Sequence, residues 1–231
     1  MGADLERLEE YKVSGGIYMA RYTGPKCRYC RAERAKLFLK GTKCLSSKCP
    51  MNNPSESGLP GKDPKTRAKK PTDYGLMLRA KQKLKRIYCM LEKQFKLTFN
   101  EANRMSGKTG DNLISLLERR LDNVVFRMHF ASSRPQASQL VSHGHVFVNG
   151  KRVDIPSYRV KAGDEISIAP QSKNMVLLRE NLLEVGKSGV MPWISVNVDE
   201  LKGTFNAVPS REEVTELTGV NEQLVVELYS R

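Results

Sequence analysis

The sequence lacks any long apolar run. None of its 231 residues belongs to a stretch of about eighteen apolar residues, which a transmembrane helix requires. Residues 1–18, MGADLERLEEYKVSGGIY, are acidic and polar, and they lack the apolar segment of a signal peptide. We therefore expect a cytoplasmic protein with no membrane partner, in a reducing compartment where structural disulfides are rare.

Residues that commonly carry catalysis are also scarce. The chain has 3 histidines, and it contains neither a nucleophile elbow nor a paired-carboxylate motif. SGKTG at 106–110 is not a phosphate-binding loop of the Walker type, because Ala102 stands where that loop needs glycine and no apolar strand precedes it. The segment is expected to connect two helices, and we expect no enzymatic activity.

Four of the 5 cysteines lie within residues 27–49. Cys27 and Cys30 are separated by two residues, and Cys44 and Cys49 follow as a second close pair after a thirteen-residue loop. Two such pairs can place four thiolates around one structural zinc ion. An iron–sulfur cluster uses the same four thiolates, and four reduced cysteines packed as small apolar side chains are a further alternative. Cys89 is expected to be a free core residue.

Negative charge is nearly missing from one third of the chain. Residues 19–86 carry 19 Lys and Arg residues against 4 acidic residues, a net charge of +15, while the rest has 20 basic and 21 acidic residues. Because such a surplus causes self-repulsion unless a polyanion neutralises it, nucleic acid is the expected partner. Within this region residues 51–71 are rich in Pro, Gly and Lys, and we expect an extended arm.

The apolar pattern predicts an α+β protein that is mainly helical. A long helix is expected from Tyr74 to Met105 after caps at Thr72 and Asp73. Thr109 should cap a second helix whose apolar stripe runs from Leu113 to Val125. Shorter expected elements are a helix within ERAKLFLK (33–40), a helix from Ser133 to Val141, a hairpin turning at Asn149-Gly150, a strand in GDEISIA (163–169), a strand or turn in ELKGTF (200–205), and a helix or strand in EQLVVELY (222–229).

Several longer motifs resemble one family across residues 19–231. They are MARYTGPKCRYC (19–30), FLKGTKC (38–44), DYGLMLRAKQKLKRIY (73–88), LEKQF (91–95), LLERRLDNVVFR (116–127), FASSRPQASQLVSHGHVFVNGKRVDIPSY (130–158) and NEQLVVELYSR (221–231). In order and spacing they resemble the bacterial small-subunit ribosomal proteins of the S-four family. All four cysteines match the cysteine-bearing, metal-binding version, and residues 1–18 match nothing in the family.

The resemblance implies three parts. Residues 1–18 would be an N-terminal extension, which we expect to be mobile. Residues 19–108 together with 192–231 would form a helical domain with an N-terminal metal knuckle, and residues 109–191 an inserted RNA-binding module with a small hairpin. Such a protein binds small-subunit rRNA directly, nucleates assembly of the small-subunit body, and helps maintain translational accuracy. Its implied neighbours are ribosomal proteins S-five and S-twelve and the messenger RNA where it enters the ribosome.

Candidate RNA contacts fall into two groups. The basic region supplies Arg21, Arg28, Lys69, Lys70, Arg79, Lys83, Lys85 and Arg86. By position, the resemblance carries over Arg119, Arg120, Arg134, Gln136, His143, His145, Asn149, Lys151 and Arg152. A helix start beside Arg134 and a basic hairpin tip offer donors to phosphate. The two histidines could equally be satisfied within the protein, Asn149 mainly forms the turn, and Asp122 is expected to pair with an arginine.

Two other classes of protein share some of these features. Pseudouridine synthases and tyrosyl-tRNA synthetases carry the same module, but they need a separate catalytic domain, and only 108 residues precede Thr109. A DNA-binding zinc protein would need a recognition helix beside its cysteines, and ERAKLFLK is too apolar for that role. We therefore expect an RNA-binding protein and no DNA partner.

Overall fold

The computed structural model describes residues 22–53, 58–61, 70–183, 189–217 and 219–230. The expected N-terminal extension and most of the expected arm between 51 and 71 lie outside these ranges. None of the helices described is long and apolar enough to cross a membrane. The helices are α1 (Cys27–Glu33), α2 (Asp73–Ile87), α3 (Glu92–Arg104), α4 (Thr109–Glu118), α5 (Leu121–Arg127), α6 (Arg134–Ser142), α7 (Val176–Leu183) and α9 (Glu222–Ser230), with short 3-10 turns η2 (Gly41–Cys44), η3 (Pro170–Ser172) and η4 (Thr215–Leu217).

Two helices replace the single helix expected from Tyr74 to Met105. Thr72 caps α2 as predicted, since its side chain accepts from the Gly75 amide at 3.2 Å. The helix then ends in a Schellman motif, in which the Met90 amide donates to the Lys85 carbonyl. Cys89 occupies the left-handed position at φ 53°, where glycine is the usual residue. No glycine marks this break, so the apolar repeat alone did not predict it.

The second expected helix is divided as well, between α4 and α5. Arg120 is extended and pairs across a β-bridge with Arg159, and the amide of Leu121 donates to the Tyr158 carbonyl at 2.9 Å. A distant segment thus takes the hydrogen bonds that would have continued the helix. Thr109 is the first residue of α4 rather than its cap, and Ser133 precedes α6 without a side-chain capping bond.

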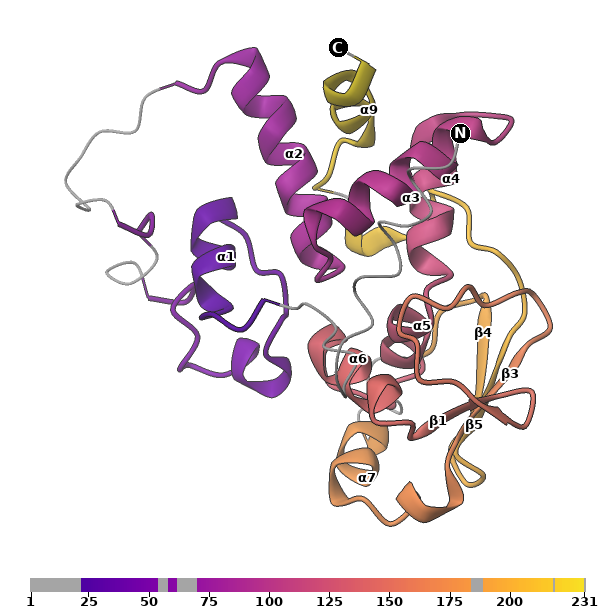
Figure 1. The fold of residues 1–231 in the computed structure, drawn as a ribbon. Helices are drawn as coiled ribbons and strands as arrows, with labels where there is room; N and C mark the ends of the chain where they lie inside the picture. The colour runs from indigo at the N-terminus through magenta and orange to yellow at the C-terminus, as the bar shows by residue number, and fades with distance from the viewer. Residues whose placement is uncertain (1–21, 54–57, 62–69, 184–188, 218, 231) are drawn as a thin grey trace, which may run out of the picture.

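One antiparallel sheet of five strands lies beside α5 and α6 (Figure 1). Its order is β2 (Lys151–Arg152), β1 (Val146–Val148), β3 (Glu165–Ile168), β5 (Lys202–Phe205) and β4 (Ile194–Asn197). The hairpin turn is confirmed: Asn149 and Gly150 both have positive φ, at 49° and 75°, as a type I′ turn requires. The strand in GDEISIA is confirmed as β3, and ELKGTF contains β5.

The C-terminal segment contributes to both ends of the molecule. Strands β4 and β5 extend the sheet of the module through pairs between β5 and β3. The chain then returns to α9, which packs against α2 and α4 at the top of Figure 1. The expected end of the inserted module at residue 191 stays a prediction; β4, an edge strand of the sheet, begins at Ile194.

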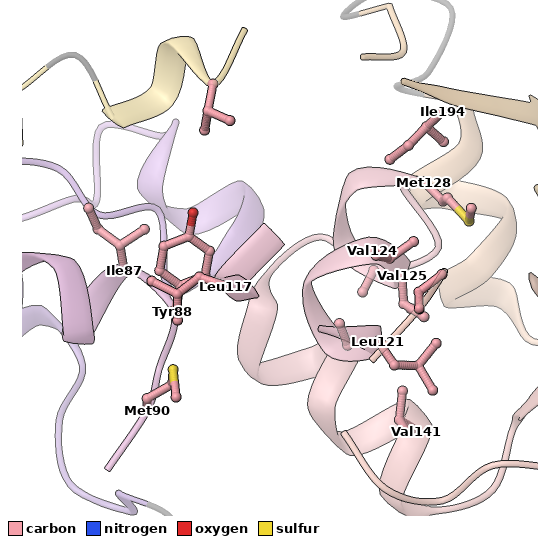
Figure 2. Packing of buried hydrophobic residues seen from close by; sticks show 14 of the residues in the cluster. Ile87, Tyr88, Met90, Leu117, Leu121, Val124, Val125, Met128, Val141 and Ile194 are labelled. Carbon is pink, nitrogen blue, oxygen red and sulfur yellow. The ribbon is translucent and has the colours of Figure 1, made fainter. Parts of the chain in front are cut away.

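A continuous apolar core joins the N-terminal helices to the sheet. In Figure 2 the side chains at the end of α2 lie on one side of the buried helix α5, and those facing the sheet lie on the other. The labelled residues are Ile87, Tyr88, Met90, Leu117, Leu121, Val124, Val125, Met128, Val141 and Ile194. This packing fixes the module against the first domain, and it positions the surfaces described next.

Candidate RNA interface and cysteine site

The cysteine segment, residues 22–49, folds with little regular structure. Cys27 and Cys30 lie in α1, which ends at Glu33 because Arg34 turns left-handed. ERAKLFLK is therefore not a helix, contrary to our expectation; it leaves α1 at once and leads to η2 with Cys44. Cys30, Cys44 and Cys49 are buried, and Cys27 is half-buried. Burial of three thiols in so short a segment brings both cysteine pairs into its small core.

The thiols influence one another electrostatically. Burial raises the pKa of the Cys30 thiol, and Cys44, Cys27 and Cys49 raise it further, while a backbone hydrogen bond from Leu37 lowers it. The Lys40 amide donates to Cys44 Sγ at 3.4 Å. Four nearby thiols with amide donors fit the donor chemistry of zinc or an iron–sulfur cluster. The described residues nevertheless contain no group of three or more His, Cys, Asp or Glu side chains arranged to hold a metal ion.

Cys89 differs from the expected core residue. It is exposed at the C-terminal end of α2, where its Sγ lies 3.7 Å from the Arg86 carbonyl oxygen. The positive φ of Cys89 follows from its position directly after the last turn of α2.

The basic face of α2 is turned partly toward the rest of the protein. Arg86 pairs with Glu33 and lies over the Tyr29 ring at 4.7 Å from its centroid. Arg79 is exposed and reaches the same carboxylate at 3.6 Å. Because Glu33 is buried under both arginines, this pairing attaches α2 to the cysteine segment.

Two lysines of the same helix contact other parts of the protein, one near the C-terminus and one at the start of α3. Lys83 Nζ donates to the Gly219 carbonyl at 2.6 Å, and Lys85 Nζ lies 2.7 Å from Glu92. Both lysines are half-buried. Of the four α2 residues predicted to bind RNA, Arg79 is therefore the most exposed, and the other three also hold the helices together.

Arg134 lies in the interior rather than on an RNA-facing surface. Its guanidinium donates to both oxygens of Glu216, at 2.9 and 2.7 Å, and to Asn123 Oδ1 at 2.8 Å. Its Cζ atom lies 4.6 Å from the centre of the Phe126 ring and 5.0 Å from that of Tyr88. The residue is 4% exposed. The predicted phosphate contact is corrected to a structural role, because these contacts occupy the guanidinium.

A buried network continues from Arg134 toward the first domain. Arg127 bridges Glu216 at 2.7 Å and Glu118 at 2.9 Å, and the Tyr88 hydroxyl donates to Glu118. Burial raises the pKa of the Glu118 carboxyl, but the Arg127 guanidinium more than offsets this, so the pKa lies below its usual range. The network connects α4, α5, α6 and η4 through ion pairs in which each charged group has a partner.

Arg120 is the second predicted RNA contact that the structure buries. It forms a bidentate pair with Asp122, at 3.1 and 2.7 Å, which confirms the expected arginine partner for Asp122. Arg119 is half-buried and donates through Nε to the Val160 carbonyl at 3.0 Å. Arg120 is therefore corrected to an internal ion-pair partner of Asp122, while Arg119 remains partly exposed to solvent.

The hairpin tip is the exposed basic part of the module. Lys151 and Arg152 are exposed on β2. Asn149 donates to Asp164 Oδ1 at 2.8 Å and accepts from the Glu165 amide at 2.9 Å, so it holds the turn in place. The two cations thus project from a turn that is fixed by hydrogen bonds at its base.

The remaining predicted contacts in the module are partly engaged with the protein. The side-chain oxygen of Gln136 accepts from the amide and hydroxyl of Ser132, both at 2.7 Å. His145 shares a hydrogen bond of 2.7 Å with Ser172, and His143 is exposed with its ring centre 6.0 Å from that of His145. His143 is therefore the more accessible of the two histidines.

In the first domain, the structure leaves two of the predicted contacts open to solvent and does not describe two others. Arg28 and Lys70 are exposed. Arg21 and Lys69 lie outside the described residues.

Sequence reasoning missed Arg159. Its NH2 nitrogen donates to Glu101 at 2.8 Å, and it lies beside Arg119 and Arg120. Burial lowers the pKa of Arg159, and its two arginine neighbours lower it further, although Glu101 opposes them. The three guanidiniums of Arg119, Arg120 and Arg159 face two carboxylates, those of Glu101 and Asp122, so this side of the module carries a local excess of positive charge. The available signal was a basic residue directly after the motif at 130–158, which ends in SY.

Comparisons with known proteins match nearly the whole chain. A family model described as "Ribosomal protein S4/S9 N-terminal domain" matches residues 21–118, and an "S4 domain" model matches residues 119–166. The small ribosomal subunit protein uS4 of Thermus thermophilus is 52% identical over 213 residues, which is 92% of this chain and 100% of that protein. The proteins of the same name from Thermoanaerobacter sp. and Pelobacter propionicus are 53% and 50% identical over the same lengths. The chain therefore belongs to the family of small ribosomal subunit protein uS4, which confirms the predictions of a structural ribosomal protein, of a location in the small ribosomal subunit in the cytoplasm, and of a non-enzymatic role.

Proposed function

We propose that the protein binds small-subunit rRNA directly and helps nucleate assembly of the small-subunit body. In the assembled subunit it contacts ribosomal proteins S-five and S-twelve, lies near the point where messenger RNA enters, and helps maintain decoding accuracy. Membership in the uS4 family supports the rRNA contact. The proposed neighbours and the effect on accuracy rest on the family resemblance.

The observation that carries the rRNA proposal is the set of unpaired lysines on the cysteine segment. Residues 22–49 hold 8 basic residues and a single acidic one, Glu33, whose charge is already taken by Arg86 and Arg79. Four exposed lysines take part in no ion pair formed by the described residues; they are Lys36, Lys40, Lys43 and Lys48. Cations without carboxylate partners are suited to neutralising phosphates. Attraction between cations and phosphates is the largest contribution to the affinity of many proteins for nucleic acids.

The module contributes a smaller and more specific surface. Residues 109–170 contain 8 basic and 6 acidic residues, and several of these already neutralise each other inside the protein. Lys151 and Arg152 at the hairpin tip, with His143 nearby in sequence, remain available for phosphates and 2′-hydroxyls. Structured RNA is recognised largely through such groups and its shape. The module is thus proposed to position the RNA, while the cysteine segment supplies most of the electrostatic attraction.

We further propose that Cys27, Cys30, Cys44 and Cys49 bind one structural zinc ion, with an iron–sulfur cluster as the alternative. A bound metal would replace the apolar core that this short segment lacks. The mutual influence of the four thiols and the amide donors at two of them support this assignment. With four protein ligands all coordination positions of the metal would be filled, so its role would be structural.

Filter binding across a salt series tests the rRNA proposal. The full chain is measured on small-subunit rRNA transcribed in vitro, with an unrelated structured RNA as the specificity control. Changing Lys36, Lys40, Lys43 and Lys48 together to Gln should reduce the log–log salt slope by about 2–4, since each phosphate contact contributes roughly 0.7–0.9. The matched variant changes four exposed lysines elsewhere, at Lys93, Lys96, Lys161 and Lys173.

The two quadruple variants carry the same net charge, so general electrostatics predicts equal losses. We expect a clearly smaller change in slope for the matched variant. Equal slopes for the two variants would contradict the proposal that RNA lies on the cysteine segment. Failure of the unmodified chain to prefer small-subunit rRNA over the control RNA would contradict the function itself.

A further inference from the structure

A cavity of about 490 Å³ lies between the cysteine segment and the module. Phe38 and Leu45 line it from the cysteine segment, and Phe126 lines it from α5. Asn181 of α7 and Met191 contribute from the other side. Its volume falls within the range of roughly 300–1,000 Å³ that is typical of small-molecule sites. The cavity is thus large enough for an organic group rather than a single water molecule.

Phe38 is held at this cavity in an unfavourable backbone conformation. Its neighbours Leu37 and Leu39 are both buried, while Phe38 itself is 40% exposed. The residue has φ 49°, in the left-handed region that large side chains rarely adopt. Such strain persists only where the surrounding structure imposes it, and here the two buried leucines do so. The result is an aromatic ring kept partly in solvent at the cavity instead of in the core.

The turn after Phe38 fixes this arrangement against the module. Gly41 has φ 55°, and a Cβ atom on it would lie 2.4 Å from Ser132 Oγ. Ser132 also lines the cavity. The close contact between Gly41 and Ser132 therefore sets the spacing between the aromatic ring and the opposite wall.

The cations beside the cavity favour an anionic ligand with an aromatic part, since the carboxylate in its lining, Glu216, is already paired with Arg127 and Arg134. Lys40 and Lys43 are exposed on either side of Thr42, which lies in the lining, and neither lysine forms an ion pair with the described carboxylates. The Asn181 amide nitrogen donates to the Phe130 carbonyl at 3.3 Å, so its oxygen can accept a further hydrogen bond. An aromatic platform, a few polar groups and flanking cations form the combination that binds unpaired nucleotides.

We propose that this cavity receives one unstacked base of the bound RNA, which stacks on Phe38 while Lys40 and Lys43 contact the adjoining phosphates. The proposal rests on the proposed rRNA-binding function and adds a base-binding site to it. Stacking on an aromatic side chain is insensitive to salt, whereas phosphate contacts are not. Loss of the ring should therefore weaken binding at every salt concentration without changing the salt slope.

The test uses filter binding of the full chain to small-subunit rRNA transcribed in vitro, over the same salt series. Phe38→Ala should lower affinity by about five-fold to a hundred-fold with an unchanged slope. Phe38→Trp, which keeps a stacking ring, should retain binding close to that of the unmodified protein. Leu97→Ala is the matched control, because Leu97 is a 60% exposed apolar residue on α3, remote in sequence from the cavity lining. It should have no effect.

Chemical probing of the bases supplies a second measurement. One base should be protected in complexes of the unmodified protein and of Phe38→Trp, and reactive again with Phe38→Ala. The proposal is wrong if Phe38→Ala binds within two-fold of the unmodified protein, or if Phe38→Trp loses as much affinity as Phe38→Ala. Circular dichroism of each variant identifies misfolding. If Phe38→Ala is misfolded, the affinity of Phe38→Trp alone decides the outcome. If the unmodified protein shows no preference for this RNA, the failure lies with the proposed function.

Discussion

Replacing Glu216 with Gln should destabilise the protein by about 3 kcal/mol, since it removes one partner from a buried ion-pair network. Glu216 accepts both guanidinium bonds of Arg134 and a further bond of 2.7 Å from Arg127. Both arginines are buried. Gln has nearly the same shape but no charge, so the two guanidiniums would share the single carboxylate of Glu118. The change therefore tests charge rather than packing.

The magnitude follows from the pKa of the carboxyl. Burial alone would raise the pKa of Glu216, but Arg134 and Arg127 lower it from 4.5 to about 2. A difference of roughly 2.5 pH units, at about 1.4 kcal/mol per unit, corresponds to about 3 kcal/mol. Breaking a buried ion pair costs roughly 3–5 kcal/mol. We take the lower end because the Glu216 side chain is 24% exposed.

Urea unfolding at neutral pH measures the effect. Trp193 is the single tryptophan and is buried, so its fluorescence reports the loss of tertiary structure. The midpoint of thermal unfolding should fall by about 6–12 °C. The control is Glu101→Gln, which removes the ion pair between the 54% exposed Glu101 side chain and Arg159 and should cost less than about 1 kcal/mol.

The stability difference should also depend on pH. A carboxyl whose pKa is lowered by folding stabilises the protein fully above its unfolded-state pKa of 4.5, and this contribution disappears as the pH falls toward 2. The gap in unfolding free energy between the unmodified protein and Glu216→Gln should therefore be constant near neutrality, begin to narrow below about pH 4.5, and vanish only near pH 2. A gap under about 1 kcal/mol at neutral pH, or one that is undiminished at pH 3, where roughly 1.4 kcal/mol should remain, would refute the assigned role.

Two further predictions concern the cysteines. Cys44→Ser should release the single metal ion proposed for the cysteine segment, while Cys89→Ser should not; elemental analysis of the purified proteins decides this, and full metal content in Cys44→Ser would reject the site. Cys89→Gly should raise the free energy of unfolding by up to about 1 kcal/mol, because glycine adopts the left-handed conformation at φ 53° without steric strain; a lower midpoint in urea would show that the thiol contributes packing that outweighs the strain.

Local chemistry made several elements predictable. Thr72 caps a helix because its hydroxyl can reach an amide three residues later, and Asn149-Gly150 turns a hairpin because both residues tolerate positive φ. These preferences depend only on neighbouring residues. The order and spacing of the motifs likewise sufficed for the family, and the charge distribution along the chain identified a polyanion as partner.

Other features depended on contacts between residues far apart in the sequence. The helix break before α5 exists because the segment ending at Arg159 supplies competing hydrogen bonds, and the repeat of apolar residues contains no sign of it. The predicted boundaries between domains remain predictions. The C-terminal segment contacts both parts of the protein, because β4 and β5 belong to the sheet of the module and α9 packs against α2 and α4.

Arg134 is the clearest example of the difference between what the sequence determined and what the tertiary structure decided. The sequence alone determined a cation beside the start of a helix, in a motif shared with an RNA-binding family. Whether that cation faced solvent depended on Glu216, 82 residues further along the chain, which the fold brings to 2.7 Å. A local pattern specifies charge and backbone conformation, but burial is decided by which distant surfaces pack together, and burial determines whether a charge is available to RNA or is used to hold the protein together.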